Sequence, residues 1–410
     1  MMETLVVMLL GKRVGVLEYA NGMLSFSYDK DYLASSDAVP VSYSLPLHPM
    51  PFDNDAVKTF FENLLPPDNV RKRLGKILHL SRNNIFGFLK AIGGDCAGAI
   101  SLHPQEEIVE SRNQPCLREL TDDEAIGILT GLHKRPLNLG KEDGFRISGT
   151  GAQDKLIACV HDGRIALPLY GTPSTHIIKT PVEAYPNSVF NELFCMKLAK
   201  VCGIPVPNCE ILTFGGIPYY CVERYDRATE DGRVRRLHQE DFCQLLGIPS
   251  DHKYESEGGP SIAACFQIIR KMRINAAGQL DFFRRIIYNF LIGNGDAHAK
   301  NFSVLYRGKG ISIAPAYDLL CTKIYPSLMD ESAMAIGGDN AFESIDAGSF
   351  RRVATACGVR DGLILPLLKE MTEDIDDKAN KLGEELLQTH PSPVYDEIRT
   401  VIKTHVRQIC

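Results

Sequence analysis

Length, composition and charge narrow the classes open to this chain. It has 410 residues, of which 44% are hydrophobic and 23% charged, ordinary values for a globular protein that exclude collagen-like, coiled-coil and disordered classes. At roughly 100–200 residues per domain, the length predicts about two to four domains or lobes. The 45 basic and 51 acidic residues leave a net charge of −6, which argues against a surface that binds nucleic acid over its whole extent.

The cysteines and the first residues indicate the compartment. The 12 cysteines form no C-x-x-C pair, so neither a zinc ribbon nor a thioredoxin-type site is predicted. Several lie among apolar residues, as in Phe194-Cys195-Met196, where a free thiol behaves as a small hydrophobic group. Residues 5–10 are too short a run for a secretion signal, and no stretch approaches the roughly 20 apolar residues of a membrane span. We expect free thiols, a cytoplasmic location and no membrane contact.

The first hundred residues are predicted to be rich in strands. Asn21-Gly22 is a hairpin signal, and Leu24, Phe26 and Tyr28 then alternate with polar residues, as in a half-buried strand. A helical pattern over residues 56–78 follows. It is interrupted by prolines at 66 and 67, and a polar stretch at 103–118 predicts the first boundary.

A second β-rich region is predicted over residues 145–225, interrupted by one helix at 187–201. After Asp226 the pattern turns helical, with a buried helix at 281–292 and a last helix starting at Ser392-Pro393. A β-rich lobe followed by a helical lobe predicts two lobes with a cleft between them. The expected strands lie at 156–160, 164–167, 175–179, 210–214 and 219–223.

The strongest chemical motif follows the buried helix directly. Asp296 and Asn301 have the D-x-x-x-x-N spacing of a phosphotransferase catalytic loop, in which the carboxylate orients and deprotonates a hydroxyl and the amide oxygen holds magnesium. Alone, the pattern is equally that of an Asx-turn before a helix. A short hairpin over residues 302–313 is predicted to return Asp318 to the mouth of this loop. Two carboxylates and an amide suit Mg²⁺ beside phosphates, although Asp318 is also an ordinary turn residue.

Further parts of such a site lie upstream in the expected order. Residues 148–155 form a loop of small residues whose N–H groups suit a phosphate, although a plain hairpin turn has the same composition. Lys179 ends an apolar strand, where it is placed either to clamp phosphates or simply to reach solvent. Glu192, on the next helix, either pairs with Lys179 or is an exposed helix residue. Residues 220–225 connect strands to helices, where backbone groups are available to an adenine edge.

The whole set resembles the HipA family of toxin kinases from bacterial toxin–antitoxin systems. The resemblance covers nearly the whole chain. It rests on these segments: ENLLP at 62–66, GGDCAGA at 93–99, SGTGAQDK at 148–155, THIIKTP at 175–181, Asn191-Glu192, VERYDR at 222–227, Gln239-Glu240-Asp241, KYESEGGP at 253–260, DAHAKNF at 296–302 and Tyr317-Asp318.

The resemblance implies roles for individual residues. Asp296 is the implied catalytic base, with Asn301 and Asp318 as Mg²⁺ ligands. Lys179 is implied to contact the ATP phosphates, and Ser148 matches the serine that the family autophosphorylates, which would repel ATP and inactivate the enzyme. The remaining implied ATP-binding residues are Gly151, Ala152, Gln153, Asp154, Lys155, Glu223, Tyr225, Gln239 and His298.

The resemblance also implies the partners and the fold. The partners are a helix-turn-helix antitoxin, operator DNA reached mainly through that antitoxin, and a protein substrate from the translation apparatus whose phosphorylation arrests growth. The implied fold is α+β: a bilobal serine/threonine-kinase-like fold with residues 1–110 as an N-terminal subdomain, 111–225 as a β-rich N-lobe and 226–410 as a mainly helical C-lobe. Two alternatives stay open: a small-molecule phosphotransferase, and a catalytically silent corepressor scaffold.

Overall fold

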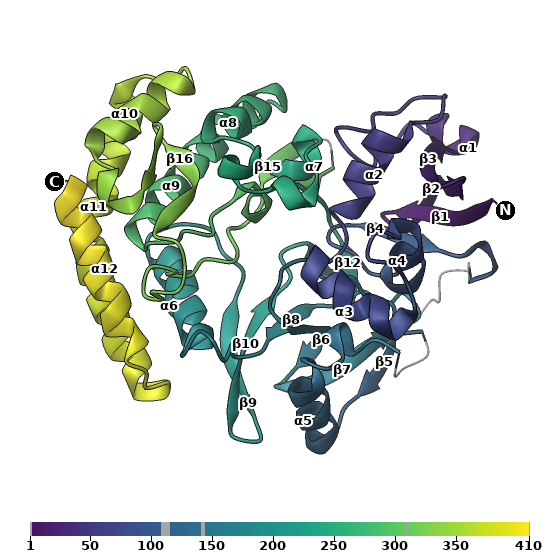
Figure 1. Ribbon diagram of the computed structural model, residues 1–410, viewed down its shortest axis with the longest axis horizontal. Helices are drawn as coiled ribbons and strands as arrows, with labels where there is room; N and C mark the ends of the chain where they lie inside the picture. Colours follow the sequence, from purple (N-terminus) through teal and green to yellow (C-terminus); the bar gives the residue numbers. More distant parts are fainter. Residues whose placement is uncertain (1, 108–114, 141–143, 309, 410) are drawn as a thin grey trace.

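The computed structural model describes residues 2–107, 115–140, 144–308 and 310–409. The N-terminal sheet and the long C-terminal helices lie at opposite ends of the molecule, with the remaining strands and helices between them (Figure 1). Within the described ranges, no helix is both long and apolar enough to cross a lipid bilayer. The cysteines of these ranges are free, and most are buried.

The N-terminal region is a four-stranded antiparallel sheet covered by helices. Its strand order is β3-β2-β1-β4, and the β2–β3 turn is the Asn21-Gly22 hairpin that the sequence predicts. The break predicted at the two prolines is confirmed, because it separates α2 from α3. The strands are β1 (Glu3–Leu9), β2 (Lys12–Ala20), β3 (Met23–Tyr28) and β4 (Ile100–His103); the helices are α1 (Lys30–Leu33), α2 (Asn54–Glu62), α3 (Asp68–Leu78) and α4 (Ile85–Ile92).

The next region is a six-stranded sheet of order β5-β7-β6-β8-β10-β9. All five strands and the helix predicted between residues 156 and 223 are confirmed. Strand β5 and helix α5 were not predicted. The elements are β5 (Cys116–Glu119), α5 (Asp122–Gly131), β6 (Lys155–His161), β7 (Arg164–Leu169), β8 (His176–Lys179), α6 (Ser188–Val201), β9 (Cys209–Phe214) and β10 (Ile217–Glu223).

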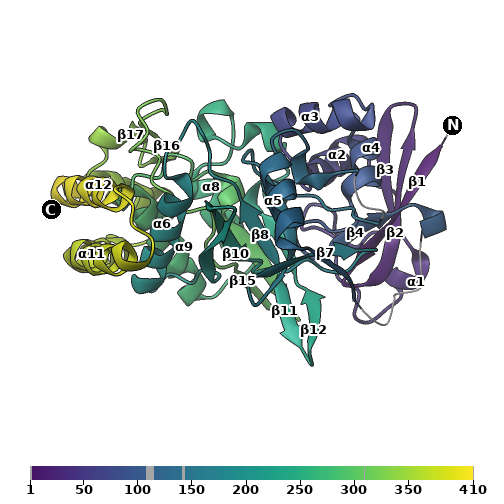
Figure 2. The same cartoon turned by 90° about the horizontal axis from the view of Figure 1, so that it is seen from below.

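The prediction that the chain turns helical straight after Asp226 is wrong. Residues 227–241 form three more strands, and β11 with β12 makes a hairpin that projects from the molecule (Figure 2). Asp231 and Gly232 both adopt positive φ at its tip, as a tight hairpin turn requires. The arginine-rich strand has no apolar alternation to reveal it. The strands are β11 (Arg227–Glu230), β12 (Arg233–Arg236) and β13 (His238–Asp241).

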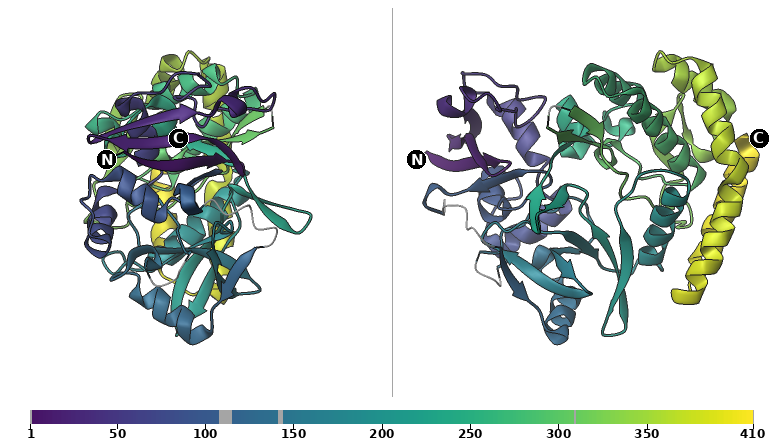
Figure 3. Two further views of the ribbon diagram at one scale, coloured as in Figure 1. Left: turned by 90° about the vertical axis from the view of Figure 1, so that its right-hand side faces the viewer. Right: turned by 180° about the vertical axis from the view of Figure 1, so that it is seen from behind.

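The rest of the chain is mainly helical, as predicted. The predicted hairpin is confirmed as β14 and β15, which extend β13 into a three-stranded sheet. Helices α11 and α12 lie side by side at the C-terminal end (Figure 2), which Figure 3 shows from behind at the far end from the N-terminal strands. The elements are α7 (Phe242–Leu246), α8 (Ile262–Lys271), α9 (Ala276–Leu291), β14 (Ser303–Arg307), β15 (Gly310–Ile313), β16 (Glu331–Ile336), β17 (Asp339–Ala341), α10 (Ala347–Ala356), α11 (Asp361–Thr389) and α12 (Val394–Ile409).

Two hydrophobic cores meet at strand β8. One joins the N-terminal sheet and its helices to the six-stranded sheet, and the other is built from α6, the β14–β15 hairpin and the later helices. Ile177 packs against both cores. Lys179, two residues further along the same strand, therefore emerges where the cores adjoin.

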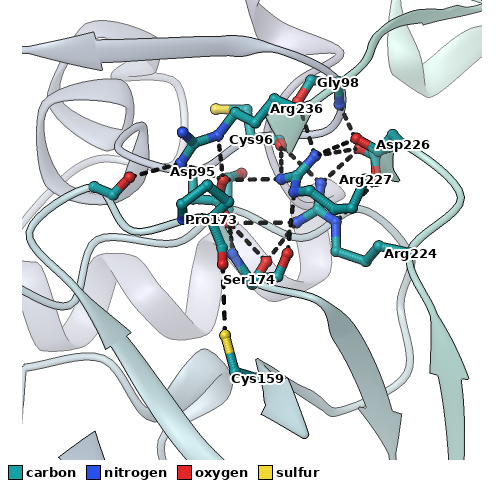
Figure 4. A network of polar contacts seen from close by, with 12 residues as sticks. Asp95, Cys96, Gly98, Cys159, Pro173, Ser174, Arg224, Asp226, Arg227 and Arg236 are labelled. Carbon is teal, nitrogen blue, oxygen red and sulfur yellow. Dashed lines mark hydrogen bonds and ion pairs between the residues drawn. The ribbon is translucent and has the colours of Figure 1, made fainter. Parts of the chain in front are cut away.

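A buried ionic cluster fastens the N-terminal region to the segment that follows β10 (Figure 4). Asp95 is 1% exposed, and its carboxylate oxygens lie 2.8 Å from both Arg227 Nη2 and Arg236 Nε. Arg224 pairs with Asp226 at 2.7 Å, and the Asp226 carboxylate accepts from the Gly98 N–H at 2.6 Å. Burial alone would raise the pKa of Asp95, but the three arginines outweigh it and hold that pKa well below its usual range.

Replacing Asp95 tests this cluster. Asp95→Asn should lower the free energy of unfolding by about 3–5 kcal/mol at pH 7, because it leaves buried guanidinium charges without their counter-charge. The loss should shrink as pH falls below about 4, since a carboxylate whose folded pKa is depressed stabilises fully above its unfolded pKa and loses this contribution progressively as pH falls toward its folded pKa. Urea denaturation measures both effects. Glu230→Gln, which breaks an exposed pair with Arg235 in the same hairpin, should behave as wild type. Equal midpoints for Asp95→Asn and wild type would contradict the account.

Candidate active site

The centre of the candidate site is the ammonium group of Lys179. Its Nζ lies 2.6 Å from Glu192 Oε1 on α6 and 2.5 Å from Asp318 Oδ1, which follows β15. The pairing of Lys179 with Glu192, one of two readings of the sequence, is thus the one observed. Lys179 faces Lys155 on β6 and Tyr220 on β10 in cross-strand register, so three neighbouring strands present these side chains in one row.

The charges of this group are strongly coupled. Burial would lower the pKa of Lys179, but Asp318 and Glu192 outweigh it and raise that pKa. Burial would likewise raise the pKa of Asp318, but Lys179 and Lys155 hold it well below its usual range. Burial raises the pKa of Glu192. Asp318 also has a positive φ of 58°, a sparsely populated conformation for a residue other than glycine. Lys179 therefore stays charged, and Asp318 is its ionised partner.

The loop of residues 148–155 leads into strand β6. Burial, and then repulsion by Lys179, lowers the pKa of Lys155 to about 8, and its Nζ donates to the Thr150 carbonyl at 2.5 Å. Gly151, at a φ of 92°, and Ala152 are exposed at the loop tip. Gln153 Nε2 donates to the carbonyl of Thr180, next to Lys179, at 2.6 Å. The loop is thus anchored to the strand that carries Lys179.

Two loop residues are bound to the N-terminal region. The Asp154 carboxylate pairs with Arg73 on α3, with Nη2 to Oδ1 at 2.5 Å. Ser148 is 2% exposed, and its Oγ donates to the Leu64 carbonyl at 2.6 Å. In this conformation neither side chain is free to meet a ligand.

The expected catalytic loop lies between α9 and β14. The Asp296 N–H donates to Asn294 Oδ1 at 3.1 Å, and the Asp296 side chain is 38% exposed. Its Oδ1 accepts a hydrogen bond from the Tyr254 hydroxyl and lies 3.7 Å from His298 Nε2. Burial lowers the pKa of His298 to about 4, so its imidazole is neutral at pH 7. An accessible carboxylate that already receives an O–H group is suited to act on a hydroxyl.

The residues expected to hold Mg²⁺ have the required oxygens. Asn301 Nδ2 donates to the Asp296 carbonyl at 2.8 Å, which leaves the amide Oδ1 as its remaining polar atom. Asp318 supplies an ionised carboxylate. Within the described residues, no group of three His, Cys, Asp or Glu side chains forms a metal cage. This donor set fits Mg²⁺, which usually binds through one or two carboxylates together with waters and substrate phosphates.

Two of the residues expected near the adenine, Tyr225 and Gln239, contact each other next to Tyr317. The Tyr225 hydroxyl donates to Gln239 Oε1 at 2.9 Å, and its ring stacks on Tyr317 with centroids 5.1 Å apart. Glu223 is exposed and accepts from Asn208 Nδ2 at 2.9 Å through its side chain. Tyr225 and Gln239 thus contact each other and reach Tyr317, the residue before Asp318, whereas the Glu223 side chain binds elsewhere.

Sequence reasoning missed several residues that shape the site. Tyr254, on the 250–259 loop, caps Asp296. Lys300 lies inside the D-x-x-x-x-N motif, yet its Nζ bonds to Asp241 Oδ2 and Asn63 Oδ1, both at 2.6 Å, so it joins the catalytic loop to the N-terminal region. Arg73 holds Asp154. Their partners are 42 to 237 positions away in the chain, and no local spacing signals such contacts.

A lysine clamped between a helix glutamate and an aspartate that follows a hairpin, on a β-rich lobe joined to a helical lobe, is the arrangement of protein kinases. Comparisons with known proteins agree. The family models for the HipA N-terminal domain and the HipA-like C-terminal domain match residues 5–103 and 147–379. The chain belongs to the HipA family of serine/threonine-protein kinases.

Individual relatives give the extent of the likeness. A putative kinase, Y4mE, of Sinorhizobium fredii is 39% identical, with 90% of this chain and 88% of that protein aligned. The serine/threonine-protein kinase toxin HipA of Shewanella oneidensis is 33% identical over 83% of this chain and 78% of its own length. The structure of the Shewanella oneidensis HipA, HipB and operator DNA complex superposes with a TM-score of 0.86 and 28% identity, covering 99% of this chain and 97% of that one. The expected fold is confirmed.

Removing the central ammonium should cost stability. Lys179→Met should lower the free energy of unfolding by about 3–5 kcal/mol, because it leaves two neighbouring carboxylates with no cation between them. Adding Glu192→Gln to that variant should recover part of the loss, since it removes one unpaired charge. Lys200→Met, which removes an exposed lysine on α6, the helix of Glu192, is the control and should leave the free energy of unfolding unchanged. Urea denaturation of the wild type, Lys179→Met, Glu192→Gln and the double variant measures the coupling, and an additive double variant would contradict it.

Proposed function

We propose that this chain is an ATP- and Mg²⁺-dependent serine/threonine-protein kinase that acts as the toxin of a toxin–antitoxin system. Its substrate would be a protein of the translation apparatus, whose phosphorylation arrests growth. The observation that carries the proposal is the buried Lys179 held between Glu192 and Asp318 beside the loop of Asp296. In this proposal residues 1–110 form the N-terminal subdomain, 111–225 the N-lobe and 226–410 the C-lobe.

The proposed chemistry assigns one task to each side chain. Asp296 accepts the proton of the acceptor hydroxyl, and the Tyr254 hydroxyl on its carboxylate occupies the position that this acceptor would take. Lys179 and Lys155 bind the phosphates. Asn301 and Asp318 hold Mg²⁺, which when bound neutralises charge on the phosphates. The backbone of Glu223 and Tyr225 meets the adenine, with Gln239 and His298 beside the nucleotide.

Autophosphorylation of Ser148 would require the loop to leave its present position. The hydroxyl is buried and bonded to the Leu64 carbonyl, so it reaches a phosphate donor only after this contact breaks. A phosphate adds about −1.5 to −2 charge and does not fit the buried position. The modified loop would stay out, and Gly151, Ala152, Gln153, Asp154 and Lys155 would no longer line the phosphate site. The enzyme would thus inactivate itself.

The proposed partners follow the relative's complex and the charge of this chain. The HipA of Shewanella oneidensis is seen with HipB and operator DNA. We extend this to a HipB-like helix-turn-helix antitoxin for the present chain, in the cytoplasm. Because the net charge here is −6, DNA contact would come mainly through a basic antitoxin.

Neutralising the proposed base should stop transfer while nucleotide binding continues. Asp296→Asn keeps the shape of the side chain but cannot accept the hydroxyl proton, so phosphoryl transfer should fall by about 10²–10⁴-fold. Transfer is followed with γ-labelled ATP, and nucleotide affinity by calorimetry. Asp251→Asn, an exposed residue of the 3₁₀ helix Ser250–His252, is the control. Wild-type rates in Asp296→Asn would show that another group is the base.

Phosphosite mapping tests the fate of Ser148. After incubation with ATP and Mg²⁺, the wild-type chain should gain one phosphate on Ser148 and lose affinity for ATP. Ser148→Ala and Asp296→Asn should both remain unmodified, the first for lack of an acceptor and the second for lack of a base. Intact-mass and peptide mass spectrometry provide the readout. A phosphate on another residue of the wild type, with Ser148 unmodified, would contradict the proposal.

A further inference from the structure

The loop of residues 250–259, between α7 and α8, is fixed against the candidate site. The Gly259 N–H donates to the Tyr254 carbonyl at 2.8 Å. A Cβ atom at Gly259 would lie 2.4 Å from the His252 carbonyl oxygen, so only glycine allows this close approach. On the other side, Glu255 accepts from the Ala335 N–H on β16 at 2.7 Å. Lys253 and Tyr254 are therefore held in place by contacts on both sides.

Lys253 brings a positive charge to the acceptor side of the site. Its Nζ lies 2.8 Å from His298 Nε2 and 4.8 Å from the centroid of the Tyr254 ring. Because an ammonium group only donates, His298 Nε2 is the acceptor and the imidazole is neutral. No carboxylate oxygen of the described residues lies within ion-pairing distance of Lys253. Among the described residues, its charge is therefore not directly paired with a carboxylate.

The other lysines near the site are already engaged. Lys179 is shared by two carboxylates, and Lys300, inside the catalytic loop, faces Asp241 and Asn63. Lys155 donates to the Thr150 carbonyl on the phosphate-loop side. His298, whose Nε2 accepts from Lys253 and lies 3.7 Å from Asp296 Oδ1, carries no charge. In the described part of the chain, Lys253 is thus a cation close to Asp296 that no carboxylate holds. It contacts His298, whose Nε2 lies 3.7 Å from Asp296 Oδ1, and it precedes Tyr254, which donates to the same oxygen.

We propose that Lys253 is a further catalytic residue, which stabilises the negative charge of the phosphoryl group during its transfer to the acceptor. The inference rests on the proposed kinase function and deepens it. As the bond from the γ-phosphorus to the ADP oxygen breaks, a bond forms from that phosphorus to the acceptor oxygen, whose proton goes to Asp296. Lys253 keeps its proton throughout and acts electrostatically, a role in which a preorganised donor is most effective.

The test separates the transition state from the ground state. Lys253→Met should lower kcat about 100-fold or more, the scale for removing one preorganised donor, with the KM for ATP changed by less than about threefold. Affinity for the combined complex of ADP, Mg²⁺ and aluminium fluoride, which mimics the transferring phosphoryl group, should fall by a similar factor. Affinity for ADP and Mg²⁺ without aluminium fluoride should stay unchanged. Lys253→Arg should recover part of the kcat and part of the affinity for the aluminium fluoride complex. Lys271→Met, which removes an exposed lysine on α8, is the control and should match the wild type in both.

The outcomes distinguish this inference from the proposed function. Wild-type kcat and wild-type affinity for the aluminium fluoride complex in Lys253→Met would overturn the role of Lys253 alone. Equal losses for ADP and for the aluminium fluoride complex, or an unfolded Lys253→Met together with a fully active Lys253→Gln, would also overturn it. A wild-type chain that transfers no phosphate and binds the aluminium fluoride complex no better than ADP would overturn the kinase proposal and this inference together.

Discussion

The arrangement of the two lobes depends on one buried positive charge. An ammonium group removed from water must be paired, and Lys179 finds its partners on two other segments, Glu192 on α6 and Asp318 after β15. The last residue of a sheet strand, a helix and the end of a hairpin are thereby fixed relative to one another. The same constraint leaves Asp318 in an uncommon backbone conformation, 22 residues beyond Asp296 in the sequence yet close enough to influence the pKa of His298. The electrostatics that hold the lobes together also assemble the phosphate side of the candidate site.

The N-terminal region is joined to this site by polar contacts rather than by an apolar face alone. The buried carboxylate of Asp95 pairs with Arg224 and Arg227, which lie on either side of Tyr225 in the sequence. Glu240, next to Gln239, accepts from Ser42 Oγ at 2.5 Å and from the Tyr43 N–H at 2.9 Å. Lys300 reaches Asn63. Each contact needs defined geometry, so the region positions residues 224–227, the strand of Gln239 and the loop of Asp296.

Much of the fold could be predicted because the signals are local. Asn21-Gly22, the alternating residues of the strands and the apolar stripe of α9 act over a few positions, and the corresponding elements formed as expected. The β11–β12 hairpin was missed because its residues are charged and lack alternation, although Asp231-Gly232 marks its turn. For the candidate site, the order of motifs offers the ion pair of Lys179 with Glu192 as one of two readings, and the structure shows that pair. It does not anticipate that Tyr254 covers Asp296, that Lys253 meets His298, or that Arg73 holds Asp154, because tertiary packing alone creates those contacts.

The central claim is that Lys179, Asp318 and Asn301 form a nucleotide and metal site between the lobes. The most direct measurement is a crystal structure with a non-hydrolysable ATP analogue and Mn²⁺ in place of Mg²⁺, with the metal located by its anomalous signal. The account predicts an anomalous peak coordinated by the oxygens of Asp318 and Asn301, phosphates in contact with Lys179, and the adenine against the backbone of residues 223–225. A nucleotide bound elsewhere, or a metal that contacts neither Asp318 nor Asn301, would contradict it.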